Sequence, residues 1–202
     1  MFNEDRKMKA NLIYIMGASG SGKDSLMRYA REKLAKHTNI VFAHRYITRP
    51  ADVGGENHVS LSPDEFSSRV AAGLFALHWQ SHGYYYGIGI EIDLWLTRGL
   101  TVIVNGSRKY LQNVYNRYTN VVPILIEVSP DILRLRLQNR NRETGEQIEK
   151  RLQRHQILAN ACEGCLKVNN DGQLNEGGDT LIDLILHYSV NDCLRQDRSI
   201  HS

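Results

Sequence analysis

Short apolar runs, separated by amphipathic stretches of ten or more residues, dominate the hydrophobic pattern of this chain. The clearest run, 100–104 (Leu-Thr-Val-Ile-Val), is apolar on both faces, as expected for a strand buried in a parallel sheet. The expected strands of this kind are 12–16, 40–43, 100–104, 121–128 and 167–169. Strands that alternate with helical patterns predict an α/β fold in which helices flank a central parallel sheet.

The stretches between these runs carry apolar residues at the three-and-four spacing of amphipathic helices. The expected helices are 25–36, 63–72, 89–98, 107–118, one that begins at Pro130, 146–158 and 180–190. The strongest start is at Ser62, an N-cap residue followed by Pro63 at the first helical position. The residues expected on buried helix faces include Ile90, Leu94, Ile132, Leu133, Leu135 and Leu137.

Residues 44–98 form an expected insertion in this α/β pattern. The segments 74–80 and 84–86 bracket Ser-His-Gly and predict a small hairpin. The insertion is rich in polar and aromatic residues, which fits either an acceptor site or a purely structural addition. Two of its four histidines, His78 and His82, are four residues apart, but they lie in the expected hairpin and not in a helix, so no metal site is expected there.

The segment 17–23 interrupts the pattern between the first expected strand and the first helix. Its sequence, Gly-Ala-Ser-Gly-Ser-Gly-Lys, has the G-x-x-x-x-G-K spacing of a loop whose backbone N–H groups wrap a polyphosphate at a helix N-terminus. A glycine-rich turn without a ligand is the alternative, and the flanking strand and helix patterns argue against it. The residues expected to hold the polyphosphate are Gly17, Ala18, Ser19, Gly20, Ser21, Gly22, Lys23, Asp24 and Ser25.

Position 24 departs from this motif. Ser or Thr normally follows the lysine and binds Mg²⁺ through its hydroxyl, whereas this chain has Asp24. A carboxylate is a better ligand for a hard cation, so Asp24 is the expected metal ligand. The strand 100–104 leads into Asn105 rather than into an acidic residue that assists magnesium, which strengthens this expectation.

Several arginines lie downstream at helical spacing. Arg136 and Arg140 are four residues apart and share one helix face, and Arg151 lies on the next expected helix. Phosphoryl transfer needs mainly alignment and charge neutralisation, so these arginines and Lys23 are the expected catalytic cations. The alternative is a solvated helix face. The turn between the helices lies in an expected lid, about 138–148, that would close over a bound nucleotide.

Composition and charge exclude other classes of protein. The 202 residues suit one domain, 1–202, and a net charge of +3 is too small to indicate nucleic acid or a membrane. No apolar run approaches the roughly 18 residues that span a bilayer, and the first residues lack a secretory pattern, so a cytoplasmic protein is expected. The pair Cys162 and Cys165 is either incidental or sensitive to oxidation. The oligomeric state stays open, with a homodimer as one option.

Several segments, in this order, resemble the guanylate kinases: the phosphate loop, 47–50, 61–66, 83–87, Arg136 with Arg140 and Arg151, and 168–171. The resemblance implies a three-layer P-loop kinase fold, with a core of about 10–43 and 99–190, an acceptor-binding insertion of about 44–98 and the arginine-bearing lid. It also implies that Arg49 and Tyr86 contact the acceptor phosphate.

The residues that contact guanine in guanylate kinases are not matched. Their two hydroxyls and two carboxylates fall on Arg45, Ile88, Leu77 and Asn105. A leucine cannot accept hydrogen bonds from a guanine edge, and each lost partner costs roughly 1–3 kcal/mol. The acceptor site is therefore not expected to bind guanine.

A closer resemblance is to the ribose 1,5-bisphosphate phosphokinases of phosphonate degradation, carried by 22–26, 43–49, 55–58, 87–96, 104–108 and 169–172. It implies transfer of the ATP γ-phosphoryl group, with Mg²⁺, to the 1-phosphate of ribose 1,5-bisphosphate. The residues expected to bind this phosphorylated sugar are Arg45, Arg49, Tyr86, Asn105 and Arg108. One alternative is a guanylate or other nucleoside monophosphate kinase. The other is a non-catalytic interaction module, and the intact Lys23 argues against this second alternative.

Overall fold

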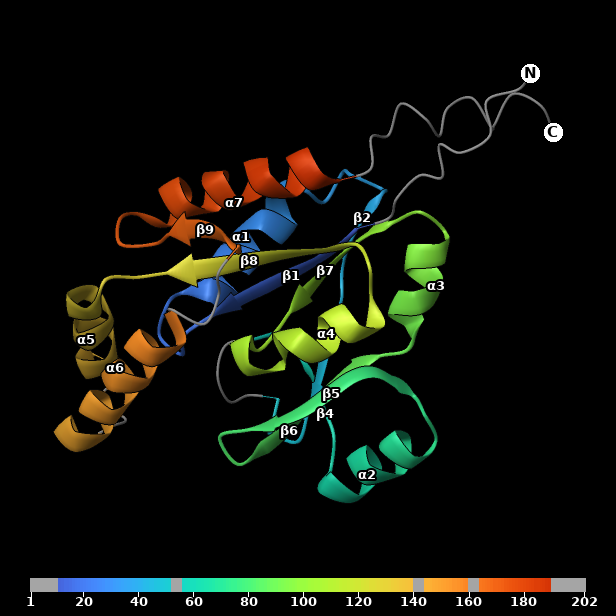
Figure 1. Cartoon of the computed structure of the whole chain (residues 1–202), viewed down its shortest axis with the longest axis horizontal. Helices are drawn as coiled ribbons and strands as arrows, with labels where there is room; N and C mark the ends of the chain where they lie inside the picture. Colours follow the sequence, from blue (N-terminus) through green and yellow to red (C-terminus); the bar gives the residue numbers. More distant parts are fainter. Residues whose placement is uncertain (1–10, 52–55, 140–143, 160–163, 190–202) are drawn as a thin grey trace.

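A five-stranded parallel sheet forms the centre of the computed structural model, which describes residues 11–51, 56–139, 144–159 and 164–189. Its strand order is β2-β7-β1-β8-β9 (Figure 1). The strands are β2 Ile40–Phe42, β7 Thr101–Asn105, β1 Leu12–Gly17, β8 Val121–Glu127 and β9 Leu166–Asn169. All four neighbouring pairs are parallel, which confirms the α/β prediction.

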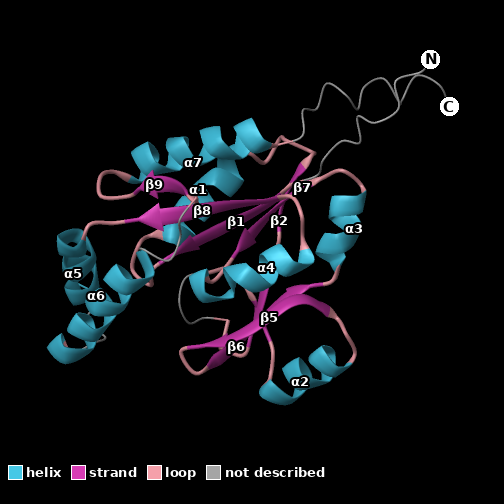
Figure 2. Cartoon of the chain, viewed as in Figure 1, coloured by secondary structure: helices cyan, strands magenta, loops and turns pink. Residues whose placement is uncertain are grey.

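Helices cover both faces of this sheet (Figure 2). The helices are α1 Lys23–Lys33, α2 Pro63–Ala71, α3 Glu91–Thr97, α4 Leu111–Arg117 with a preceding 3-10 turn η1 Arg108–Tyr110, α5 Pro130–Asn139, α6 Gly145–Ala159 and α7 Leu174–Tyr188. Ile13 and Ile15 of β1 pack with residues of α1 and α7, whereas Tyr14 and Met16 on the opposite face pack with residues of α3 and α4. Alternation along a strand that is buried on both faces explains these two cores.

The insertion contains a second sheet of four strands in the order β4-β3-β6-β5. Its strands are β4 Val59–Ser60, β3 Arg45–Ile47, β6 Tyr84–Gly89 and β5 Phe75–Ser81. The predicted hairpin is confirmed as β5 and β6, joined through His82 and Gly83, which both have positive φ angles (50° and 78°). Two consecutive positive φ values are typical of the tight turn whose twist suits a hairpin.

The predicted helix start at Ser62 is also confirmed. The Ser62 side chain accepts a 3.1 Å hydrogen bond from the Glu65 backbone N–H, and Pro63 is the first helical residue. This helix, α2, packs Phe66 against Phe75 of β5 with ring centroids 4.7 Å apart. The cap and the stacked rings fix α2 against the outer strand of the insertion.

Two predicted helix faces were wrong in part. Ile90 and Leu94 are 38% and 51% exposed, and the fully buried residue of α3 is Ile92. The helix begins later than expected because β6 extends to Gly89, and the side of α3 that packs on the core carries Ile92, Trp95 and Leu96. In α5, Leu133 and Leu137 are buried as expected, but Leu135 is 52% exposed because it lies on the opposite side of the helix.

The last helix, α7, begins at Leu174, six residues before the predicted start at Thr180. Two consecutive glycines favour a loop over a helix, yet Gly177 and Gly178 are both buried inside the helix. A Cβ atom on Gly178 would lie 2.4 Å from the Tyr29 ring of α1. Close packing of α7 on α1 therefore requires glycine here and overrides its low helix propensity.

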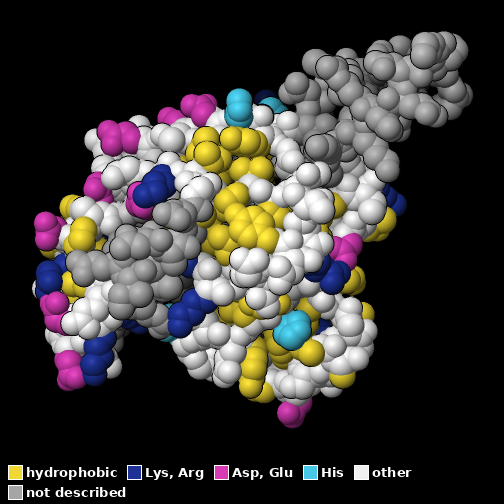
Figure 3. Space-filling model, in the orientation of Figure 1, with side chains coloured by type: hydrophobic (Ala, Val, Ile, Leu, Met, Phe, Trp, Pro, Cys, Tyr) yellow, Lys and Arg dark blue, Asp and Glu magenta, His cyan; other side chains and the backbone are white. Residues whose placement is uncertain are grey.

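Within the described residues, no helix combines the length and the apolar character needed to cross a bilayer. On the face shown in Figure 3, Lys and Arg side chains of the described residues are scattered among acidic and hydrophobic ones. Residues 140–143 of the expected lid, Cys162 of the C-x-x-C pair and the two chain ends lie outside the described residues.

Candidate active site

The phosphate loop joins β1 to α1 at the carboxyl end of the central sheet. Gly20 and Gly22 have φ angles of 98° and 82°, which residues other than glycine rarely adopt. A Cβ atom on Gly22 would also lie 2.3 Å from the Asn170 side-chain nitrogen. The Ser21 hydroxyl in this loop is buried and has no hydrogen-bond partner among the described residues. This buried donor and the start of α1 together suit an anionic ligand.

Asn170 and Arg136 hold the loop from the other side. The Asn170 side-chain amide donates a 2.6 Å hydrogen bond to the Ser21 carbonyl oxygen. Arg136 donates to the same carbonyl at 3.3 Å and to the Asn170 carbonyl at 2.8 Å. Arg151 donates a 2.9 Å hydrogen bond to the Ser19 hydroxyl. The structure thus brings two of the three expected arginines to the loop, and Arg140 lies outside the described residues.

The helices that carry these arginines also pack on the loop through apolar contacts. Ala18 of the loop belongs to the same buried cluster as residues of α5 and α6, namely Leu133, Leu137, Ile148 and Leu152. A Cβ atom on Gly20 would lie 2.8 Å from a methyl carbon of Leu133. The loop and the two arginine-bearing helices are therefore one packed unit.

Lys23, Asp24 and Asn105 form a connected group at the end of β7. The Lys23 ammonium donates to the Asp24 carboxylate at 2.8 Å and also to the Asn105 side-chain oxygen. The Asn105 amide donates a 2.9 Å hydrogen bond to the same Asp24 oxygen. The Lys23 charge holds the pKa of the Asp24 carboxyl well below its usual range, although partial burial opposes this shift. Asp24 thus carries a negative charge near neutral pH.

A magnesium ion would fit this group only if Asp24 and the substrate phosphates bound it together. Among the described residues, no cluster of three or more His, Cys, Asp or Glu side chains could hold a metal. Mg²⁺ commonly takes one or two protein carboxylates and completes its shell with substrate phosphates and water. The half-exposed Asp24 side chain beside the phosphate loop suits that arrangement.

Glu56 connects two of the expected acceptor-binding arginines. It accepts two hydrogen bonds from the Arg45 guanidinium, one of them 2.5 Å long, and lies 3.6 Å from Arg49 Nη2. The side chains of Arg45, Arg49 and Glu56 are only 10–15% exposed. Arg49 Nε and Nη2 are buried without a hydrogen-bond partner among the described residues. Glu56 therefore neutralises this pair only in part, and Arg49 keeps donors for another anion.

No role for Glu56 follows from the sequence alone. Its amino-acid type and its position in the polar insertion are visible in the sequence, but its contacts depend on how the insertion folds against the core. The Asn105 amide lies 3.3 Å from a Glu56 oxygen, so Glu56 also connects the acceptor arginines to the Lys23 group.

Tyr86 lies beside these arginines within an aromatic stack. The Arg45 guanidinium carbon is 5.1 Å from the centroid of the Tyr86 ring, and Trp79 stacks on the same ring at 5.7 Å with an interplanar angle of 4°. Burial raises the pKa of the Tyr86 hydroxyl, so it stays protonated and able to donate a hydrogen bond. The structure therefore places Tyr86 beside Arg45, another of the expected acceptor-binding residues.

Tyr14 fixes the turn that follows Asn105. Its buried hydroxyl accepts a 2.8 Å hydrogen bond from the Ser107 backbone N–H and donates to the Ser107 carbonyl at 3.2 Å. A Cβ atom on Gly106 would lie 2.0 Å from the Tyr14 ring, so only glycine fits above it. Arg108 follows at the first position of η1, where it is partly buried.

Two of the four positions that correspond to guanine contacts are apolar and buried. Leu77 is 1% exposed and Ile88 is completely buried, and both belong to a hydrophobic core cluster. Neither side chain has a hydrogen-bonding group, so this part of the insertion cannot select a base edge by hydrogen bonding.

A glycine-rich phosphate loop between β1 and α1, braced by arginines from two neighbouring helices, defines a P-loop kinase architecture. The guanylate kinase family model matches residues 9–188, and the chain belongs to that family.

Within the family, the chain is similar to several proteins named ribose 1,5-bisphosphate phosphokinase PhnN. It is 53% identical to the protein from Thiobacillus denitrificans over 178 residues, which cover 88% of this chain and 93% of the relative. It is 52% identical to the protein from Desulfomicrobium baculatum over 90% of this chain and 97% of the relative. The crystal structure of guanylate kinase from Anaplasma phagocytophilum shares the fold, with a TM-score of 0.70, 19% identity and 96% of each chain covered.

Proposed function

We propose that this chain is a kinase that transfers the γ-phosphoryl group of ATP to the 1-phosphate of ribose 1,5-bisphosphate. The products would be ADP and 5-phospho-α-D-ribose 1-diphosphate. The names of relatives that are more than 50% identical over most of both chains support this reaction. Phosphonate catabolism in the cytoplasm, where ATP is available, is the proposed setting.

The donor site in this proposal is the phosphate loop, Gly17 to Ser25, within a core of about 10–43 and 99–190. The buried Ser21 hydroxyl and the start of α1 support binding of the ATP phosphates. Lys23, Arg136, Arg140 and Arg151 would neutralise the transferring phosphoryl group. Hydrogen bonds from Arg136 and Arg151 to the loop support this role, and the lid, about 138–148, would exclude water.

Asp24 is the proposed protein ligand of Mg²⁺. When bound, Mg²⁺ would neutralise charge on the phosphates of the donor. The charged Asp24 carboxylate, held beside Lys23 and Asn105, supports this assignment.

The acceptor site is proposed within the insertion, about 44–98, and at the end of β7, with Arg45, Arg49, Tyr86, Asn105 and Arg108 as its residues. The observation that carries the proposal is Arg49, whose buried Nε and Nη2 have no hydrogen-bond partner among the described residues. A phosphate would supply acceptors for these donors. The apolar Leu77 and Ile88 argue against a guanine acceptor.

The chemistry needs no base from the protein. The attacking atom is an oxygen of the 1-phosphate, which is already anionic near neutral pH. A new P–O bond forms to this oxygen as the bond between the γ-phosphorus and the ADP oxygen breaks. The side chains named above would align the two anions and reduce their repulsion.

A coupled assay that detects ADP tests the proposal. The chain, ATP and Mg²⁺ are combined with either ribose 1,5-bisphosphate or GMP, and we expect turnover of the sugar bisphosphate only. Turnover of GMP without turnover of the sugar bisphosphate would replace the proposal with a nucleoside monophosphate kinase. Absence of ATP binding by calorimetry would point to a non-catalytic interaction module.

A further inference from the structure

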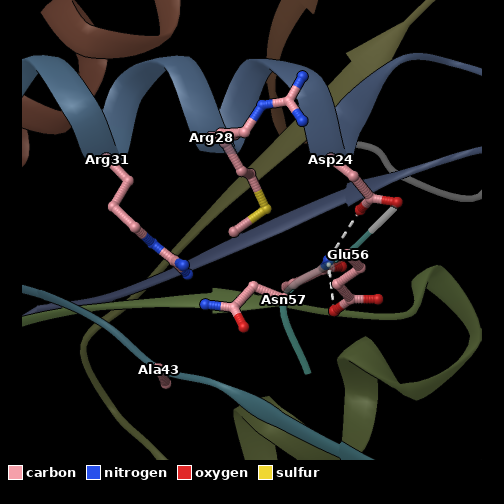
Figure 4. A pocket seen from close by; sticks show the side chains of 8 residues that line it. Asp24, Arg28, Arg31, Ala43, Glu56 and Asn57 are labelled. Atoms are coloured by element: carbon pink, nitrogen blue, oxygen red, sulfur yellow. Dashed lines mark hydrogen bonds between the residues drawn. The ribbon is translucent and has the colours of Figure 1, made fainter. Parts of the chain in front are cut away.

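A pocket extends from the donor site along α1 (Figure 4). It is lined by Asp24, Met27, Arg28, Arg31, Ala43, Glu56, Asn57 and Asn105. Asp24 and Asn105 form the donor end of the pocket, beside Lys23 of the phosphate loop, whereas Arg31 lies two helical turns farther along α1. At about 1.5 Å per residue, this spacing places Arg31 about 10 Å along the helix axis from Asp24. The pocket therefore has a second, basic end away from the phosphate loop.

Arg31 has the features of an anion-binding residue. Its Nε is buried and has no hydrogen-bond partner among the described residues. Figure 4 shows its side chain extending from α1 into the pocket, with Asn57 on the facing side. Its guanidinium lies over the Phe42 ring, 5.4 Å from the centroid, which limits the directions in which it can point. Burial lowers the pKa of Arg31, although the Glu56 charge opposes this shift.

We propose that Arg31 binds the 5-phosphate of the acceptor, while the 1-phosphate lies at the donor end of the pocket beside Asn105. This inference rests on the proposed function. A sugar with phosphates at C1 and C5 presents two anions at opposite ends, so cations at two separated places suit it. Arg45 and Arg49 meet at Glu56, and Arg31 supplies a separate cation on α1.

A purely structural role for Arg31 makes a different prediction. Arg31 is in the last turn of α1, where a cation interacts favourably with the helix dipole, and its stacking on Phe42 adds to stability. Removal of a structural arginine would weaken every activity and the thermal stability together. Removal of a 5-phosphate ligand would affect only acceptors that carry that phosphate.

The test compares Arg31→Met with the wild type on two acceptors, ribose 1,5-bisphosphate and ribose 1-phosphate. Both present the same reacting phosphate, and only the first has a 5-phosphate. We expect Arg31→Met to raise KM for the bisphosphate about 10- to 100-fold, the effect of losing a charge-assisted hydrogen bond. KM for ATP and turnover of ribose 1-phosphate should change less than about twofold, and Arg31→Lys should restore part of the loss.

Lys33→Met is the matched control, because Lys33 is exposed on the same helix and does not line the pocket. Lys33→Met should change neither the KM for the bisphosphate nor the KM for ATP. An unchanged KM for the bisphosphate in Arg31→Met, or an equal loss with both acceptors, would overturn the inference. Calorimetry with ribose 5-phosphate tests Arg31 without turnover: we expect binding to the wild type and to Lys33→Met but not to Arg31→Met. If the wild type turned over no bisphosphate, the proposed function would fail while this binding result would still decide on Arg31.

Discussion

The side-chain amide of Asn105 donates a 2.9 Å hydrogen bond to Asp24 and so ties the end of β7 to the first turn of α1. Lys23 donates to both partners of this bond. The strand thus contributes an amide and the helix contributes the carboxylate. The negative charge of this group therefore lies on the helix, one residue after the phosphate-loop lysine, and not at the end of the strand.

Replacement of Asp24 by Ser tests whether this carboxylate holds the metal. A hydroxyl is a weaker ligand for a hard cation, so we expect the Mg²⁺ concentration for half-maximal rate to rise about tenfold or more. Initial rates at increasing Mg²⁺ measure the effect. Asp131→Ser, an exposed acidic residue in the first turn of α5, is the control and should behave as the wild type. Full activity of Asp24→Ser with unchanged magnesium dependence would refute the assignment.

Asp24 should also make stability depend on pH. Because the Lys23 charge lowers the pKa of the folded-state carboxyl, its contribution is fully present above the unfolded value of about 3.9 and is lost as pH falls toward the lower folded value. The difference in unfolding free energy between the wild type and Asp24→Asn should be constant from about pH 8 to about pH 5 and shrink below about pH 4. Urea unfolding at each pH measures it. A difference that changes between pH 8 and pH 5 would contradict this origin.

Glu56→Gln should destabilise the fold because it leaves buried arginine charge uncompensated. Loss of one partner of a buried ion pair costs roughly 3–5 kcal/mol, and both side chains here are 10% exposed. Chemical denaturation gives the free energy of unfolding. Glu65→Gln breaks the exposed pair with Arg69 and should cost less than about 1 kcal/mol. Equal costs in the two variants would show that the Arg45–Glu56 pair is effectively solvated.

Arg151→Met should lower kcat about 100-fold with little change in KM for ATP, the effect of removing one donor that acts on the transition state. The 2.9 Å hydrogen bond from Arg151 to Ser19 keeps its guanidinium at the loop. Lys150→Met removes a neighbouring exposed charge on the same helix and should leave kcat unchanged. A rise in KM for ATP at constant kcat would instead assign Arg151 to ground-state binding.

The central sheet could be predicted because each strand carries its own signal. The strand β7 carries β-branched residues on both faces, and only a strand that is covered on both sides excludes all of them from water. The hairpin and the Ser62 cap were predictable for the same reason, since local turn and capping chemistry determines them. The start of α7 was missed because the close approach of Tyr29, which is distant in the sequence, requires glycine at Gly178, and a Cβ atom on Gly177 would lie 3.1 Å from the Asn169 carbonyl oxygen.

The candidate site also contains a part that local sequence predicts and a part that depends on distant contacts. The phosphate loop is a local motif, and its glycines are visible in the sequence. Glu56 and Asn170 act through partners 11 to 149 positions away, so spacing alone could not assign them. The predicted buried face of α3 was also wrong, because packing against the core selects the side with Ile92, Trp95 and Leu96.

The contact between Glu56 and the two arginines also bears on how the product would leave. Because a carboxylate already neutralises part of the arginine cluster, a phosphate that bound the unpaired donors of Arg49 would meet less positive charge than two free arginines would present. The nearby Glu56 carboxylate would also repel the phosphate, so only the surplus of attraction over repulsion would appear as affinity. This balance would weaken the binding of acceptor and product alike and favour release of the product over tight retention.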